Sequence, residues 1–432
     1  MANIIHSEIG SHPADWSIQR VDSLFDIQQG KSVSKAHRQG SNQKPFLRTK
    51  NIFWGKIDFS ELDQMHFTEQ EEARLKLQSG DLLLCEGGDV GRTAIWNDQM
   101  EGCYYQNHLH RLRAKIAHKV DPKFALYWFW YAFKVADLYI GRSNVTTIPN
   151  LSQSKLSELQ ILEPEIDEQR QITHVLNVVQ TAVEQQARLI ELTRELKAAL
   201  MKNLFTEGLL GEKQKETEIG PVPETWIVER LSSLFTIKHG FGFKGEYFKV
   251  KGTYILLTPG HFFEDGGFRD QKEKTKFYTG KIPEGFILQK GDLLIAMTEQ
   301  KAGLLGSSII IPESNKYLHN QRLGLIQNLD HRLDKDFLFY YFNTSYPRRE
   351  IFSTATGSKV RHTSPSKVLN LKIAFPKIEE QKKIADTLKT IDRKLVSLNK
   401  KNLLLQELFR TLLHQLMTGQ IRVNNVNLPD LS

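Results

Sequence analysis

Hydrophobic residues recur with helical spacing in two long stretches of the chain. One stretch follows Asp167 and the other follows Gln381, and in both the apolar positions alternate between steps of three and four residues. This heptad spacing lines apolar side chains along one seam of a helix and is typical of paired helices. The predicted pairing positions are Ile172, Leu176, Val179, Val183 and Ile190 in the first stretch and Ile384, Leu388, Ile391, Leu395, Leu398, Asn402 and Leu405 in the second.

Each stretch predicts a helix of about 38 residues, roughly 57 Å long, which needs a partner to bury its seam. The two seams differ in chemistry. Polar Gln186 of the first seam corresponds to Leu398 of the second, and Asn402 of the second corresponds to Ile190 of the first. We interpret Asn402 as a residue that fixes register. We therefore expect the helices to pair with each other as an antiparallel coiled coil with an approximate two-fold axis.

Ahead of each long helix the pattern changes to short strand-like runs mixed with a few helical stretches. Examples are GDLLLCE from Gly80 and GDLLIAM from Gly291. The aromatic runs ALYWFWYAF and FLFYYF each follow an Asp-x-x-Phe, and we interpret them as buried helix faces and not as base-stacking surfaces. The pattern predicts mixed α+β units.

The chain contains an internal repeat. The segment IGSHPADWSIQRVDSLFDIQQG at residues 9–30 aligns with IGPVPETWIVERLSSLFTIKHG at 219–240, with 10 identities in 22 positions. Further on, SKLSELQILEPEIDEQRQITHVL from Ser154 aligns with SKVLNLKIAFPKIEEQKKIADTL from Ser366. The segments between these anchors diverge. A duplicated scaffold with unlike loops is expected if each copy recognises a different ligand by the same geometry, although loops also drift without function.

The repeat and the helices together predict the order of domains. We expect two similar α+β domains in tandem, each followed by a long helix. The predicted borders are 1–163 for the first recognition domain, 164–207 for its helix, 208–218 for a connector, 219–375 for the second domain, 376–423 for the C-terminal helix and 424–432 for a tail.

Bulk composition adds little to this picture. The 432 residues are 40% hydrophobic and 25% charged, as in ordinary globular proteins, and the formal charge of +8 suits a polyanionic partner without identifying one. The longest apolar run, from Phe124 to Phe133, is about half of a membrane span. We expect a cytoplasmic protein that has no membrane partner.

Cysteine and histidine spacing gives no support for a metal site. Cys85 and Cys103 are spaced unlike a zinc or redox motif, so we expect two inert thiols. His108 and His110 would share one face of a strand, but no further Cys/His cluster accompanies them, and we interpret them as packing residues. We predict no metal.

The duplicated motifs resemble those of the type I restriction-modification specificity subunit family. They are the IGxxPxxW openings at Ile9 and Ile219, the P-x-I-[DE]-E-Q-[RK]-x-I helix entries at Pro164 and Pro376, and the closing MTGQIRV from Met417. The resemblance spans almost the whole chain. The first copy departs at its helix end, which reads LMKNLFTEGLLG where the second reads LLHQLMTGQIRV, so the path of the connector stays open.

This resemblance implies that the chain recognises a bipartite target in double-stranded DNA, with one half-site for each domain. It also implies that the helices dock DNA methyltransferase subunits, and that restriction/translocase subunits join the complex. S-adenosylmethionine, ATP and Mg²⁺ would then be bound by those partner subunits, with no cofactor in this chain.

Motifs for catalysis point the same way. The chain has no Pro-Pro pair for an adenine methyltransferase loop, and Phe25 stands where a phosphate-binding loop ending at Gly30 and Lys31 would need glycine. G-x-S-x-G and H-E-x-x-H are also absent. We expect a recognition subunit without catalytic residues.

Base readout needs side chains with paired donors or acceptors, and phosphate binding needs cations. The divergent segments carry such residues, although each is also compatible with an ordinary solvated loop. The candidates in the first domain are Arg48, Lys50, Asn51, Arg92, His108, Arg142, Asn144 and Thr147. Those in the second domain are Thr258, His261, Gln300, Lys301, Arg322, Ser358, Lys359, Arg361 and His362. Asn107 and Asn320 align with each other, so we expect them to share a structural hydrogen bond.

Two other functions remain open from the sequence. The chain is also compatible with a specificity module of another DNA methylation or restriction system. A coiled-coil adapter that joins proteins without touching DNA is a third possibility, against which the unlike Arg/Asn/Lys-bearing loops argue. The target sequence and its gap length are not readable from these residues.

Overall fold

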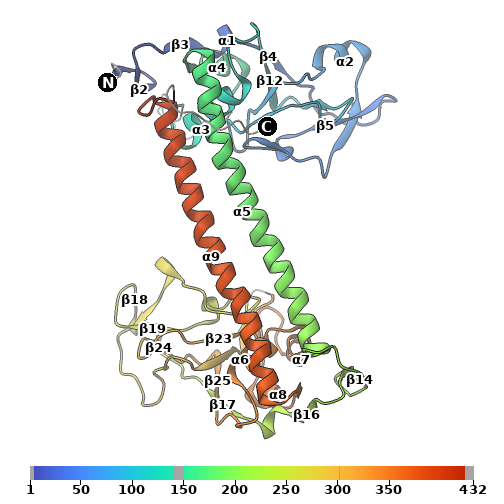
Figure 1. Ribbon diagram of the computed structural model, residues 1–432, viewed down its shortest axis with the longest axis vertical. Helices are drawn as coiled ribbons and strands as arrows, with labels where there is room; N and C mark the ends of the chain where they lie inside the picture. The colour runs from blue at the N-terminus through green and yellow to red at the C-terminus, as the bar shows by residue number, and fades with distance from the viewer. Residues whose placement is uncertain (1–3, 140–149, 301, 424–432) are drawn as a thin grey trace. The chain divides into compact units, whose positions relative to one another are not determined.

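The computed structural model describes residues 4–139, 150–300 and 302–423 (Figure 1). Contacts divide the chain into two compact units, one of residues 1–188 with 400–432 and one of residues 189–399. Each unit contains one domain of mixed helix and sheet together with parts of both long helices. The predicted fold class, two tandem α+β domains each followed by a long helix, is confirmed. The domain borders given above stay a prediction.

A four-stranded antiparallel sheet forms the centre of the first domain, in the order β10-β9-β12-β4. Its strands are β4 (Phe25–Gln29), β9 (Leu82–Cys85), β10 (Thr93–Ile95) and β12 (Leu109–Ala114). All four residues of β9 are buried. Leu82 and Leu84 pack into one core, and Leu83 packs into another. The continuous apolar run in the sequence therefore reflects a strand that is covered on both faces.

One of these cores is formed with the aromatic helix α3 (Pro122–Lys134). The Asp121 carboxylate accepts the backbone N–H groups of Lys123 and Phe124, and Pro122 occupies the first turn, which together fix the start of the helix. Nine residues of α3 are buried, so the interpretation of its aromatic run as a buried face is confirmed.

Shorter elements complete the first domain. Short strand pairs accompany a three-stranded sheet, and residues of that sheet belong to the second core. These elements are β1 (Ile4–Ser7), β2 (Gly10–Pro13), β3 (Ser17–Arg20), α1 (Val21–Leu24), β5 (Gln43–Leu47), η1 (Thr49–Asn51), β6 (Ile52–Phe53), β7 (Lys56–Ile57), β8 (Asp63–His66), α2 (Glu69–Leu75), β11 (Tyr104–Tyr105), α4 (Gln153–Glu158) and β13 (Gln160–Glu163).

The second domain repeats this frame. Its central sheet has the order β17-β25-β21-β23, and its aromatic helix α6 (Lys335–Phe342) is capped by Asp334 as α3 is by Asp121. The sheet strands are β17 (Thr236–His239), β21 (Leu293–Ala296), β23 (Ser308–Ile310) and β25 (Leu323–Gln327). The remaining elements are β14 (Gln214–Lys215), β15 (Val222–Pro223), β16 (Ile227–Arg230), η2 (Leu231–Ser233), η3 (Gly245–Tyr247), β18 (Phe248–Lys249), β19 (Tyr254–Leu256), η4 (Pro259–His261), η5 (Lys272–Lys274), β20 (Phe277–Tyr278), β22 (Thr298–Glu299), β24 (Tyr317–Leu318), α7 (Ser345–Ser353), β26 (Arg361–His362), α8 (Pro365–Leu369) and β27 (Lys372–Phe375).

The two long helices are α5 (Ile166–Thr206), with 41 residues, and α9 (Ile378–Met417), with 40 residues. A glutamine of the shared entry motif anchors each of them. The Gln169 amide donates to the carbonyl of Pro164 at 2.8 Å and accepts from the N–H of Asp121 at 2.9 Å. Gln381 makes the same two bonds in the second domain. The repeated motif therefore joins each long helix to the capped start of an aromatic helix.

The helices pair in opposite directions within each unit (Figure 1). In the first unit, Ile172 from the early part of α5 shares a core with Leu413 and Leu416 from the late part of α9. In the second unit, Leu204 from late α5 shares a core with Ile384 from early α9. The beginning of one helix thus meets the end of the other, which confirms the antiparallel pairing.

The predicted pairing positions are buried or half-buried in both helices. Six are buried, namely Ile172, Leu176, Ile190, Ile384, Leu388 and Leu398. The other six are half-buried, namely Val179, Val183, Ile391, Leu395, Asn402 and Leu405. In the second unit an ion pair supports the pairing, with 2.6 Å between Lys197 Nζ and Asp392 Oδ1.

Candidate nucleic-acid interface

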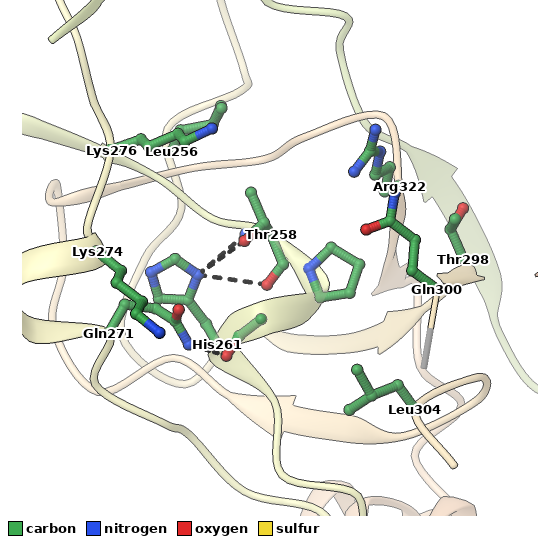
Figure 2. Close-up of a pocket in the computed structure, with 12 residues that line it drawn as sticks. Leu256, Thr258, His261, Gln271, Lys274, Lys276, Thr298, Gln300, Leu304 and Arg322 are labelled. Atoms are coloured by element: carbon green, nitrogen blue, oxygen red, sulfur yellow. Dashed lines mark hydrogen bonds between the residues drawn. The ribbon is translucent and has the colours of Figure 1, made fainter. Parts of the chain in front are cut away.

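The second domain has a pocket of about 340 Å³ that gathers side chains from several separate segments (Figure 2). The lining includes three basic residues and no acidic one. Its members are Leu256, Thr258, Pro259, Gly260, His261, Gln271, Lys274, Lys276, Thr298, Gln300, Leu304 and Arg322. Four of the candidates predicted from the sequence, Thr258, His261, Gln300 and Arg322, are among them.

Arg322 stands directly before β25, and its side chain is exposed. Its backbone is held on both sides, since its N–H donates to Asn320 Oδ1 at 3.0 Å and its carbonyl accepts from the N–H of Met297 at 2.9 Å. The guanidinium makes no hydrogen bond or ion pair with any residue that the structure describes. Figure 2 shows Arg322 near Gln300 on one side of Thr258, with Lys274 and Gln271 on the other side.

His261 has a structural role in the wall of this pocket. The ring is 3% exposed, and its Nδ1 accepts the backbone N–H of Thr258 at 3.2 Å, which closes the turn η4. Burial lowers the pKa of His261, so the ring is neutral near pH 7. A direct DNA contact by His261 stays a prediction; in the structure its ring is enclosed, and Nδ1 is engaged in closing the turn.

The segment TGSKVRH reaches the same region through the short strand pair β22 and β26. Thr298 is opposite His362 in this pair, and its hydroxyl lies 3.2 Å from His362 Nδ1. The Arg361 guanidinium stacks 4.0 Å from the centre of the Phe352 ring. Ser358 and Lys359 are exposed in the turn that leads to β26.

A buried carboxylate shapes the loop that carries Gln300. Glu299 is 3% exposed, and its Oε2 accepts three backbone N–H groups, those of residues 303, 304 and 305, each at 3.0 Å. This bonding fixes the loop without any contribution from DNA. Lys301, the remaining candidate in this loop, lies outside the described residues.

In the first domain Asn51 takes the place that His261 has in the second. Its Oδ1 accepts the N–H of Arg48 at 2.9 Å, and its amide donates to the carbonyls of Asp58 and Glu61 at 3.0 Å. The side chain is 2% exposed, and its hydrogen-bonding groups are engaged inside the fold. A DNA contact by Asn51 stays a prediction, while in the structure its side chain closes the turn η1.

Three basic candidates of the first domain surround this turn. Arg48 Nη1 lies 2.8 Å from an Asp63 oxygen, and Lys50 Nζ lies 2.7 Å from a Glu61 oxygen. Each basic side chain is 40% exposed. Such exposed ion pairs contribute about 0–1 kcal/mol, so phosphate groups can compete for these cations.

Arg92 is more enclosed than these two residues, because its side chain is 18% exposed. Its Nη2 donates to the carbonyl of Thr49 at 2.9 Å, and the guanidinium lies 5.6 Å from the centre of the Phe53 ring. These contacts favour a role in joining two loops over contact with a base.

His108 is 57% exposed, and its Nδ1 lies 3.7 Å from an oxygen of buried Glu86. It occupies the same backbone position as Arg322, because its carbonyl accepts the N–H of Glu86 at 2.9 Å, just as the carbonyl of Arg322 accepts that of Met297. The two domains therefore present different side chains at one equivalent point of the frame.

The same backbone pattern corrects one sequence alignment. The N–H of Asn107 bonds to the carbonyl of Lys31, whereas at the matching place the N–H of Gln321 bonds to the carbonyl of Phe241. Asn107 therefore corresponds to Gln321, and Asn320 corresponds to Gln106. The alignment of Asn107 with Asn320 was therefore wrong by one residue, and the two side chains do not share an equivalent position.

Some predicted candidates cannot be compared with the structure, and some residues that line the pocket were not predicted. Arg142, Asn144 and Thr147 lie outside the described residues. The sequence reasoning missed Gln271, Lys274 and Lys276, which line the pocket. They belong to the segment that leads into β20, which pairs with β19 as β8 pairs with β5 in the first domain, and the basic run QKEKTK was the available signal.

Taken together, the repeated frame with unlike side chains at equivalent, exposed positions defines a two-domain recognition protein. The family described as "Type I restriction modification DNA specificity domain" matches residues 13–194 and 223–407, and the chain belongs to this family. Among the described residues, no helix has the length and apolar character needed to cross a membrane.

Individual relatives agree with this assignment. The type I restriction enzyme MjaVIII specificity subunit of Methanocaldococcus jannaschii is 25% identical over 420 residues, which cover 96% of this chain and 95% of that protein. The EcoKI specificity subunit of Escherichia coli K12 is 22% identical over 174 residues, or 40% of this chain and 37% of that protein.

Two solved structures share the fold. The type I restriction-modification S subunit from M. genitalium aligns with a TM-score of 0.54 and 17% identity, covering 93% of this chain and 96% of that one. A chain from a structural study of complex assembly and conformational transition in a type I R-M system aligns with a TM-score of 0.59 and 15% identity, covering 95% of this chain and 99% of that one.

Proposed function

We propose that this chain is the DNA sequence-specificity subunit of a type I restriction-modification complex and reads a bipartite target, with one half-site for each domain. The observation that carries the proposal is the duplicated frame with exchanged side chains. His108 and Arg322 share one backbone position, and Arg48 and Thr258 share another as the residues that precede a 3₁₀ turn. A rigid frame that presents different side chains is suited to reading two different base sequences.

Charge supports DNA as the ligand. The chain has a formal charge of +8, and the pocket of the second domain is lined by Lys274, Lys276 and Arg322 without a carboxylate. Cations of this kind bind phosphates and supply affinity that falls with salt, while neighbouring amides and hydroxyls can contact base edges. Arg48 and Lys50 would serve the first domain in the same way.

We further propose that methyltransferase subunits dock on the outer faces of the long helices. Exposed leucines on α5 are Leu189, Leu192 and Leu196, and those on α9 are Leu403, Leu404 and Leu408. Apolar side chains exposed along paired helices favour a protein partner, because water contacts them at a cost. The methyl donor, ATP and Mg²⁺ would be bound by the methyltransferase and translocase subunits, and this chain would supply recognition alone.

The test is to co-express the chain with the methyltransferase encoded beside it and to map methylated adenines across the genome by single-molecule sequencing. The proposal predicts one bipartite motif with a fixed gap. A stoichiometric complex of the two proteins that leaves no sequence-specific methylation would contradict it and would favour an adapter without DNA recognition.

A further inference from the structure

We propose that Arg322 reads a guanine in the second half-site and that His108 occupies the equivalent reading position for the first half-site. This inference rests on the proposed function and deepens it, since it names the residue pair that makes the two half-sites different. The backbone is fixed in the same way around both residues.

Each of the two residues ends a tight turn and enters the middle of the central sheet. The N–H of Leu323, after Arg322, bonds to the carbonyl of Asn320 at 3.0 Å. The N–H of Leu109, after His108, bonds to the carbonyl of Gln106 at 3.0 Å. The following strands, β25 and β12, are each hydrogen-bonded on both sides. The side chains at these two points are therefore presented by turns that are anchored on the central sheet of each domain.

The guanidinium of Arg322 is available for a ligand. Several other arginines of the second domain are held by carboxylates, backbone carbonyls or an aromatic ring. Arginines engaged in this way are Arg332, Arg348 and Arg361. Arg322 makes no such contact with the described residues, so binding DNA requires no internal bond to break. Its two parallel N–H groups match O6 and N7 of guanine in the major groove.

The surroundings of Arg322 fit a base edge beside a phosphate backbone. Gln300 and Thr258 line the same pocket and offer amide and hydroxyl groups for hydrogen bonds to bases. Lys274 and Lys276 add two positive charges to the lining, which suits the phosphates of the same strand. The pocket thus combines the two kinds of contact that sequence-specific binding needs.

The experiment compares the wild-type complex with the Arg322→Ala complex, each co-expressed with its methyltransferase. The wild-type motif is mapped first, and binding to duplexes with single base-pair changes is then measured by competition. Arg322→Ala is expected to remove discrimination at one G·C pair of the second half-site, by roughly 5- to 150-fold, and to leave every other position unchanged. Arg322→Lys keeps the charge but lacks the fork, so it is expected to lose most of the same discrimination.

Matched variants separate base reading from loss of charge. Arg349 is exposed on α7 and does not line the pocket, so Arg349→Ala is expected to leave discrimination intact. His108→Ala is expected to change discrimination in the first half-site only. If the wild-type complex yields no bipartite motif, the proposed function fails. If the motif exists but Arg322→Ala retains its discrimination, or weakens all positions equally as a lost phosphate contact would, the guanine-reading inference is overturned.

Discussion

The residues that follow α9 pack on the first domain through Arg422. Its guanidinium pairs with Glu168, with 2.8 Å between Nη2 and Oε2, and with Asp15 at 2.9 Å. The same Glu168 oxygen accepts the indole N–H of Trp16 at 3.0 Å. Glu168 has a side chain that is 6% exposed, whereas that of Asp15 is 63% exposed. The buried pair therefore dominates this contact.

Arg422→Ala would leave the Glu168 carboxylate buried with the Trp16 indole as its remaining strong donor. Removing one partner of a buried pair costs about 3–5 kcal/mol. Because the Arg422 side chain is 24% exposed, water screens part of this loss. We expect about 2–3 kcal/mol, equivalent to roughly 30- to 150-fold in the equilibrium that opens this contact. Asp15→Ala removes only the exposed partner and is expected to cost about 0–1 kcal/mol.

Hydrogen exchange followed by mass spectrometry of the whole chain measures this opening directly. Peptides that cover residues 413–423 are expected to exchange roughly 30- to 150-fold faster in Arg422→Ala, and at most about 5-fold faster in Asp15→Ala. In the double variant Arg422→Ala/Glu168→Gln, the cost is expected to be smaller than the sum of the single costs, because no buried charge is left unpaired. Equal exchange in Arg422→Ala and Asp15→Ala would refute the reasoning.

The pH dependence of this contact has a defined sign. The Arg422 guanidinium lowers the pKa of Asp15 below its usual value of 3.8. A carboxyl group whose pKa is lowered by folding stabilises the fold above its unfolded pKa, and that contribution is lost as pH falls through the folded pKa. Between pH 5 and pH 8, wild type is therefore expected to be slightly better protected at residues 413–423 than Asp15→Ala, by an amount that does not change with pH. That difference is expected to vanish in stronger acid.

Three further predictions concern DNA affinity, helix pairing and docking. Lys274→Ala and Lys276→Ala are each expected to weaken binding equally for all sequences and to reduce the slope of log K against log salt by about 0.9, measured by salt titration. Asn402→Leu is expected to stabilise helix pairing by about 1–2 kcal/mol, because Asn402 Oδ1 is buried without a hydrogen-bond partner among the described residues; an unchanged or lower Tm would contradict this. Leu196→Asp is expected to weaken methyltransferase binding at least tenfold in a pull-down titration while leaving the helix content unchanged, since Leu196 is 54% exposed. Glu195→Ala, on an exposed neighbouring position, is the control for that variant.

The sequence was sufficient for the fold because its signals were long and duplicated. The heptad spacing predicted two helices of about 38 residues, and the structure has helices of 41 and 40 residues. The Asp-x-x-Phe context identified the aromatic runs as buried helices. The role of the repeated helix-entry motif became clear only in the structure, where Gln169 and Gln381 join each helix entry to the cap of an aromatic helix. A spacing pattern alone does not show which hydrogen bonds a glutamine makes.

The candidate site was harder to predict, because polar side chains in loops have similar chances of facing inward or outward. Asn51 and His261 look like base-reading residues in the sequence, but each closes a 3₁₀ turn from inside the fold. The alignment of Asn107 with Asn320 failed by one residue because a small insertion lies between two anchors. Lys274 and Lys276 were missed although the basic run QKEKTK that contains them is visible in the sequence.

The most direct test of the central claim is an exchange of one domain. Residues 219–375 would be replaced by the second domain of another family member, and the methylated motif would be mapped for both complexes. If each domain reads one half-site, the exchange changes one half of the motif and leaves the other half as it was. A change in both halves, or in neither half despite a stoichiometric complex that methylates DNA, would contradict the account.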